Sequence, residues 1–183
     1  MPSAIKQRLD YADYRAVPPD GKTYQILDGN VYVTPAPSPR HQRICRELFR
    51  RLDEHVRRHG SGEVFFSPID VILGPHDIVQ PDLVVVAEPG QVSDRGIEGA
   101  PRLVVEVLSR TTRDHDLGVK TQRYAALGVP HYWIVDPEAR RIECLRLEDG
   151  RYRRIAPLES DTILRHPDWP GLRIELAGVW ADS

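Results

Sequence analysis

Apolar residues recur at helical spacing over one long segment of the chain. Residues 40–59 predict an amphipathic helix that ends at Gly60. Five apolar residues recur on one face: Ile44, Cys45, Leu48, Leu52 and Val56. Residues 115–127 predict a second helix that ends at Gly128, and residues 5–15 predict a short one that ends before Pro18 and Pro19.

Short apolar runs between glycines and prolines predict strands. Residues 23–27 and 31–34 predict a hairpin around Asp28-Gly29-Asn30. The other predicted strands cover residues 63–73 (bent near Pro68), 79–87, 103–108 and 132–135, and a hairpin of 141–147 with 151–156. Residues 74–77 predict a turn, 88–101 a polar loop, and 157–183 a weakly patterned tail. This order indicates an α/β or α+β domain in which the two longer helices flank a mixed central sheet.

The composition is that of a soluble globular protein. The 183 residues are 40% hydrophobic and 28% charged, with a net charge of −2, which excludes a collagenous, low-complexity or mostly disordered chain. No apolar run approaches the ~20 residues of a membrane span, and the first ten residues lack a signal-peptide core. Cys45 and Cys144 stand alone, so neither a zinc site nor a disulfide is expected. We therefore expect a cytoplasmic protein with no membrane partner.

Three charged residues break the apolar pattern. Asp82 opens a strand that reads as buried on both faces, and Glu106 is the only charged residue of the run 103–109. Lys120 lies three residues after Leu117 and four before Tyr124, so it points the way the apolar residues point. Each also has a purely structural interpretation. Asp82 would be a solvated strand end, Glu106 one partner of a salt bridge, and Lys120 a lysine whose stem packs while its amine reaches water.

Taken together, the three residues favour one chemistry. Two carboxylates on neighbouring strands can hold a hard divalent cation through oxygen ligands. A nearby lysine can orient an attacking water or offset the charge that builds on a phosphate. Metal and ammonium together suit phosphodiester hydrolysis.

An ordered set of motifs resembles a known family. The segments are Gln80-Pro81-Asp82, Val105-Glu106-Val107-Leu108-Ser109, Asp116-Leu117-Gly118-Val119-Lys120, Tyr124, Gly128-Val129 and Tyr132-Trp133-Ile134-Val135-Asp136-Pro137. They are similar to the Uma2-like restriction endonuclease family, also called the domain of unknown function 820, within the PD-(D/E)xK nuclease superfamily. The resemblance runs from about Tyr24 to Leu147 and includes Leu27-Asp28-Gly29 and Ser38-Pro39-Arg40-His41.

The resemblance implies a restriction-endonuclease-like fold and a metal-dependent DNA endonuclease. It makes Asp82, Glu106 and the carbonyl of Val107 the metal ligands, for Mg²⁺ or Mn²⁺, and Lys120 the catalytic lysine. The superfamily lysine would stand two residues after Glu106, where this chain has Leu108, and Lys120 matches the place that this family uses on the next helix. The family's usual glutamate before Tyr-Trp is His131 here, so no role of that glutamate carries over.

The resemblance also sets the expected domain and assembly. We expect one domain over residues 1–183, with an N-terminal helix and hairpin (1–38), a core (39–147), and a hairpin strand and tail (148–183). Cutting two strands takes two sites, so a homodimer or higher homo-oligomer that acts on DNA is expected.

Four further residues are candidates for a supporting role. For His41 the favoured interpretation is packing or a structural hydrogen bond, and for Asp116 an acid at the helix start. Tyr124 is favoured as a core residue, whereas Asp70 faces either the metal or the surface.

Residues 40–59 carry seven arginines against three acids. A solvated helix face is favoured over a phosphate-binding one. Two other functions remain open: a non-catalytic nucleic-acid-binding or protein-interaction module that keeps the fold, and a phosphoesterase for a small substrate.

Overall fold

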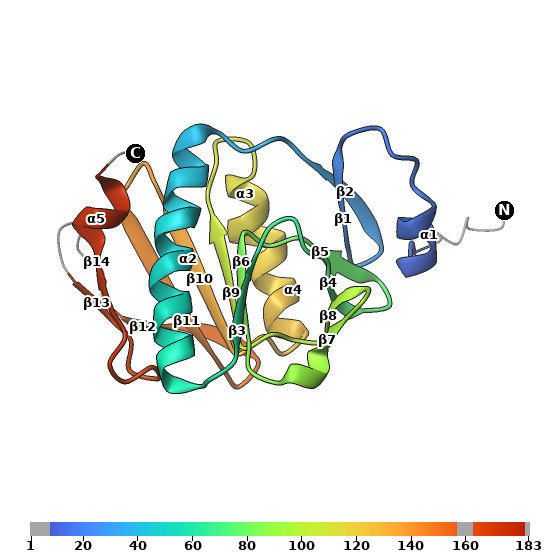
Figure 1. Cartoon of the computed structure of the whole chain (residues 1–183). Helices are drawn as coiled ribbons and strands as arrows, with labels where there is room; N and C mark the ends of the chain where they lie inside the picture. The colour runs from blue at the N-terminus through green and yellow to red at the C-terminus, as the bar shows by residue number, and fades with distance from the viewer. Residues whose placement is uncertain (1–7, 157–162, 182–183) are drawn as a thin grey trace, which may run out of the picture.

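A mixed six-stranded sheet forms the centre of the molecule (Figure 1). A computed structural model describes residues 8–156 and 163–181 of the chain. The strands follow the order β12(Arg151–Ala156), β11(Arg141–Glu148), β10(His131–Asp136), β9(Leu103–Val107), β6(Leu83–Val86) and β3(Glu63–Phe66). The pair β9 and β10 is parallel and all other neighbours are antiparallel. The predicted mixed central sheet and the hairpin of β11 with β12 are confirmed.

Helices cover both faces of this sheet (Figure 1). The predicted long helix is α2(Pro39–His59), with Ser38 as its N-cap and Gly60 in a left-handed conformation at its end. Its residues Ile44, Leu48 and Leu52 pack against alternate residues of β9 and β10, such as Val105 and Trp133. The connection from β9 to β10 covers the other face, where Tyr124 packs with Val104 and Tyr132. This alternation gives the parallel strands two buried faces.

The second predicted helix has three parts. These are α3(Arg113–His115), a π-helical turn η2(Asp116–Lys120), and α4(Thr121–Ala126). Asp116, Lys120 and Tyr124 are its buried residues, whereas Leu117 is 41% exposed. The expectation that Leu117 lies on the buried face with Lys120 was therefore wrong. The residues that face inward are instead Asp116, Lys120 and Tyr124, which are spaced four residues apart.

A second six-stranded sheet was not predicted. Its order is β2(Asn30–Thr34), β1(Thr23–Leu27), β5(Asp77–Val79), β4(Val71–Gly74), β8(Gly96–Glu98) and β7(Val92–Ser93). The hairpin of β1 and β2 is confirmed, as is the turn between β4 and β5. A short helix α1(Tyr11–Ala16) with Asp10 as its N-cap precedes this sheet, and part of the helix predicted over 5–15 lies outside the described residues.

The two sheets share segments that were expected to be single strands. The predicted strand 63–73 divides into β3 and β4, and the predicted strand 79–87 into β5 and β6. Both breaks contain a proline, Pro68 or Pro81, which has no N–H to donate to a strand ladder. The predicted loop 88–101 also contains the turn η1(Pro89–Gln91) and the strands β7 and β8. At each proline the chain thus passes from one sheet to the other, and the passage from β5 to β6 contains Asp82.

The end of the chain is structured where a tail was expected. The strands β13(Ile163–Arg165) and β14(Arg173–Glu175) form a hairpin, and α5(Leu176–Trp180) follows. Trp169, Leu172 and Trp180 are buried in the core that α2 covers. The predicted α+β class is thus confirmed. No helix among the described residues has the length and apolar character that crossing a membrane requires.

Candidate active site

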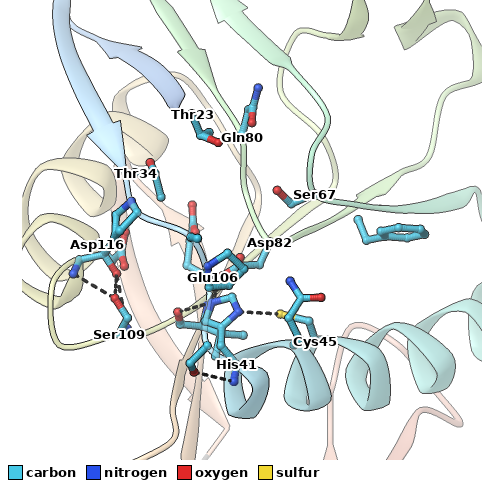
Figure 2. A pocket seen from close by; sticks show the side chains of 18 of the residues that line it. Thr23, Thr34, His41, Cys45, Ser67, Gln80, Asp82, Glu106, Ser109 and Asp116 are labelled. Atoms are coloured by element: carbon cyan, nitrogen blue, oxygen red, sulfur yellow. Dashed lines mark hydrogen bonds and ion pairs between the residues drawn. The ribbon is translucent and has the colours of Figure 1, made fainter. Parts of the chain in front are cut away.

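A pocket of about 740 Å³ opens between the two sheets (Figure 2). Its walls come from the start of α2, the strands β1 and β2, the segment before β6, and the end of β9 with the loop that follows. The charged residues singled out from the sequence, Asp82, Glu106 and Lys120, all line it. Residues that stand in separate motifs therefore meet in one cavity.

Strand pairing brings the two carboxylates together. Leu83 of β6 pairs with Val105 of β9, so Asp82, directly before β6, lies beside the end of β9. The Val107 N–H donates a hydrogen bond to Asp82 Oδ2 at 2.7 Å. This bond fixes the Asp82 carboxylate against the backbone of the strand that carries Glu106.

His41 contacts the same two groups from the first turns of α2. Its Nε2 lies 3.2 Å from Asp82 Oδ2 and 3.0 Å from the Val107 carbonyl oxygen. Its Nδ1 lies 3.5 Å from the sulfur of Cys45, one turn on. Burial alone would lower the pKa of His41, but the hydrogen bond and charge of Asp82 raise it above the ordinary histidine value. Figure 2 shows His41, Cys45 and Asp82 facing one another.

Glu106 sits in a buried network on the opposite side of the site. Its Oε1 accepts hydrogen bonds from Lys120 Nζ and from the Tyr124 hydroxyl, both at 2.8 Å. Lys120 Nζ also lies 3.0 Å from Asp116 Oδ1. The Thr121 and Tyr132 hydroxyls donate to the Asp116 carbonyl, at 2.9 and 3.0 Å. These two bonds hold the π-helical turn that turns Asp116 and Lys120 inward.

The network is short of positive charge. Burial raises the pKa of Glu106 to about 8, although Lys120 pulls it down, and the charges of Asp116 and Asp82 raise it further. Burial would lower the pKa of Lys120, but Glu106 and Asp116 raise it above the ordinary lysine value. Three carboxylates therefore share one ammonium and one histidine.

This donor set fits a divalent cation. A cation beside Asp82 and Glu106 would favour the ionised form of Glu106, which burial disfavours. Single ligand atoms of His41, Cys45 and Asp82 also lie within 4.8 Å of one another, so a nitrogen donor stands next to the carboxylate. The Cys45 thiol is a weaker candidate, because burial raises its pKa and keeps it protonated.

The four supporting residues differ in their relation to the pocket. His41 and Asp116 line the pocket with the three charged residues and Val107, whereas Tyr124 contacts Glu106 from within the core. Asp116 is the acidic residue in the first turn of η2, as expected, but it is only 2% exposed and its carboxylate lies 3.0 Å from Lys120 Nζ. Asp70 is not among the lining residues; its carboxylate accepts from Tyr14 and from Gln80.

Other lining residues were not predicted. Thr23, Thr34 and Gln80 stand across the pocket from the carboxylates (Figure 2). Phe49 and Phe66 line it as well. Gln80 belongs to the Gln-Pro-Asp motif, so its position beside Asp82 was a usable signal, but no local pattern marks the others.

Two comparisons with known proteins bear on this site. A family model named Uma2 and described as "Putative restriction endonuclease" matches residues 11–177. A crystal structure of "a putative nuclease belonging to DUF820" from Anabaena variabilis ATCC 29413 superposes with a TM-score of 0.76. It is 15% identical, and the alignment covers 94% of this chain and 98% of that one. No curated protein matches the chain. At that identity the likeness shows the fold, and it confirms the restriction-endonuclease-like class.

Proposed function

Since the chain belongs to the Uma2 family of "Putative restriction endonuclease" proteins, we propose that it is a Mg²⁺-dependent endonuclease that hydrolyses phosphodiester bonds of DNA. The observation that carries the proposal is the convergence of Asp82, Glu106 and Lys120 on one pocket with more carboxylates than cations. A structural ion pair needs one carboxylate for its lysine, whereas this site holds three.

Asp82, Glu106 and the Val107 carbonyl are the proposed metal ligands, and His41 stands next to two of them. When bound there, Mg²⁺ acidifies water and stabilises negative charge on the phosphate. Mn²⁺ suits the same set, since His41 adds an imidazole nitrogen.

Lys120 acts as a cation and hydrogen-bond donor. The raised pKa of Lys120 keeps it charged, so it does not accept the proton of the attacking water. Glu106 fixes its ammonium at 2.8 Å, which removes the entropy of a free lysine side chain. A fixed ammonium stabilises the charge that develops on the phosphate without reorganising during the reaction.

The test is cleavage of supercoiled plasmid with Mg²⁺, Mn²⁺ or EDTA by the wild type and by Asp82→Asn, Glu106→Gln and Lys120→Met. We expect metal-dependent cleavage that each substitution lowers roughly 100-fold or more. Glu54→Gln on the exposed side of α2 is the matched control, because it removes a carboxylate outside the pocket.

Metal binding by calorimetry separates this proposal from its alternative. If the domain is a non-catalytic module, its Glu106 network is complete without a cation. Absence of both Mn²⁺ binding and cleavage in a folded wild type would favour that module. Binding that Asp82→Asn abolishes would support the nuclease.

A further inference from the structure

An exposed aromatic ring stands at the rim of the pocket. Phe66 is 60% exposed, more than any other large hydrophobic residue of the described chain. It lies against Phe49 of α2 with ring centroids 5.1 Å apart and an interplanar angle of 84°. The edge-to-face contact orients the Phe66 ring while leaving most of it open to solvent.

The backbone fixes Phe66 close to the proposed metal ligands. Phe66 ends β3 and pairs with Leu83, the residue after Asp82. The next residue, Ser67, donates its N–H to the Asp82 carbonyl at 3.0 Å. The ring therefore cannot shift along the strand relative to Asp82, and any group that stacks on it is placed beside the reacting phosphate.

The wall across the pocket is polar and uncharged. Thr23 and Thr34 of the second sheet face the cavity, as does Gln80, which directly follows β5 (Figure 2). Gln25 lines the pocket as well but is only 2% exposed. Its Nε2–H donates to Thr34 Oγ1 at 2.7 Å, while its Oε1 has no hydrogen-bond partner among the described residues. Hydroxyls and an unsatisfied amide suit the edge of a heteroaromatic ring better than they suit a phosphate.

The third wall carries positive charge. Arg43 and Arg46 of α2 line the pocket, and the Arg46 side chain is 66% exposed, 3.7 Å from Glu47. The pocket thus combines an aromatic platform, a polar wall and arginines with the proposed metal site. A cavity of about 740 Å³ also has the size that encloses a small organic ligand, beyond what a phosphate alone fills.

From this juxtaposition we infer that the pocket holds an unpaired nucleobase stacked on Phe66, so that the endonuclease acts on single-stranded DNA. The inference rests on the proposed function and names its substrate class. Bases of an intact duplex cover one another's faces, whereas unpaired bases stack on aromatic side chains and expose their edges for hydrogen bonds. A purely duplex-specific site has no use for an open ring at this position.

The test measures binding of fluorescein-labelled oligothymidine and of a hairpin duplex of equal length, by anisotropy with Ca²⁺ in place of Mg²⁺. We expect tighter binding of the single strand. Phe66→Ala should weaken its binding roughly tenfold and leave the duplex unchanged, since one stacked base contributes on that order. Phe66→Tyr should restore binding, and Val92→Ala, which trims an exposed apolar residue of β7, should have no effect.

An abasic scan of the single strand sharpens the test. At one position the loss of the base should weaken binding as much as Phe66→Ala does, and the two changes together should cost no more than either alone. Additive losses at every position, equal losses for duplex and single strand, or no binding of either DNA would overturn the inference. Binding that depends on Phe66 without any cleavage would instead refute the proposed nuclease activity and leave the base pocket standing.

Discussion

The parallel strands β9 and β10 carry a buried polar cluster at each end, and the two clusters treat charge in opposite ways. Near the carboxyl ends, Glu106, Lys120 and Asp116 are each at most 4% exposed and keep ionised partners within 3.0 Å. This charged cluster lies on the face covered by α3, η2 and α4.

At the amino ends, the cluster is neutral. His131, the first residue of β10, and His166 are 7% and 4% exposed and pack against Trp169 with centroids 4.7 and 4.2 Å away. Burial lowers the pKa of both histidines to about 4, so neither is charged near neutral pH. The carboxylate beside them, Asp168, is held by Arg146 at 3.0 Å.

The difference separates a cluster that avoids the cost of buried charge from one that bears it. A buried titratable group normally avoids the cost of its charge by staying neutral, as the histidines do. The charged cluster holds two carboxylates, those of Glu106 and Asp116, around one lysine, an arrangement that an apolar core of the same shape would match or exceed in stability. The proposed function accounts for this cost in stability, because a bound cation and a phosphate would balance the buried charges.

The largest expected effect comes from breaking the charged cluster. Lys120→Met keeps the aliphatic stem but leaves Glu106 and Asp116 buried without an ammonium. We expect a loss of about 3–5 kcal/mol in the free energy of unfolding at pH 8, measured by urea denaturation. Without Lys120, the folded-state pKa of Glu106 rises further above its unfolded value, so the penalty should grow as the pH rises.

A double variant provides the control. Glu106→Gln with Lys120→Met removes the charge of Glu106 together with its partner, so most of the lost stability should return. If Lys120→Met alone is as stable as the wild type at pH 8, the buried carboxylates do not depend on the Lys120 ammonium, and the contrast between the two clusters fails.

The neutral cluster should respond to acid. The unfolded pKa of each histidine is 6.5 and the folded pKa about 4, so the unfolded state binds more protons between these values. Stability should fall as the pH drops below about 6.5 and should stop falling from this source below about 4. We expect a loss of roughly 2 kcal/mol for each histidine by pH 5, because this pH lies well below the unfolded pKa and above the folded one.

The matched variant is His131→Gln with His166→Gln. It removes both titrating groups, so its unfolding free energy should lose the part of the acid dependence that the histidines cause. Parallel pH profiles for the variant and the wild type would show that the acid response comes from the carboxylates elsewhere.

The sequence predicted the charged cluster because its members violate local patterns. Glu106 interrupts an apolar run and Lys120 sits among apolar positions, so each stands out without any knowledge of the fold. The family resemblance then ordered them, and membership of that family is confirmed. The burial of Asp116 could not be predicted, because a buried acid in the first turn of a helical segment has the same local sequence as an exposed one.

Features that depend on long-range pairing were not predictable in this way. The prolines at 68 and 81 indicate where the runs 63–73 and 79–87 bend, but the sequence does not show that the halves of each run belong to different sheets. Phe66 reads as an ordinary strand residue until its exposure is known. The buried residues of the tail, such as Trp169 and Leu172, lack a period because they pack onto a distant helix, α2.

The smallest expected effect comes from an ion pair outside both clusters, and it tests whether burial is what separates them. Arg58 lies 2.6 Å from Glu54 on α2, with both side chains more than half exposed. Arg58→Ala should change the free energy of unfolding by less than about 0.5 kcal/mol, because water and salt screen an exposed pair. Urea denaturation of this variant beside Lys120→Met, at equal ionic strength, makes the measurement. A loss comparable to that of Lys120→Met would mean that buried and exposed ion pairs contribute equally to the free energy of unfolding. The contrast between the charged and the neutral cluster would then say nothing about the candidate site.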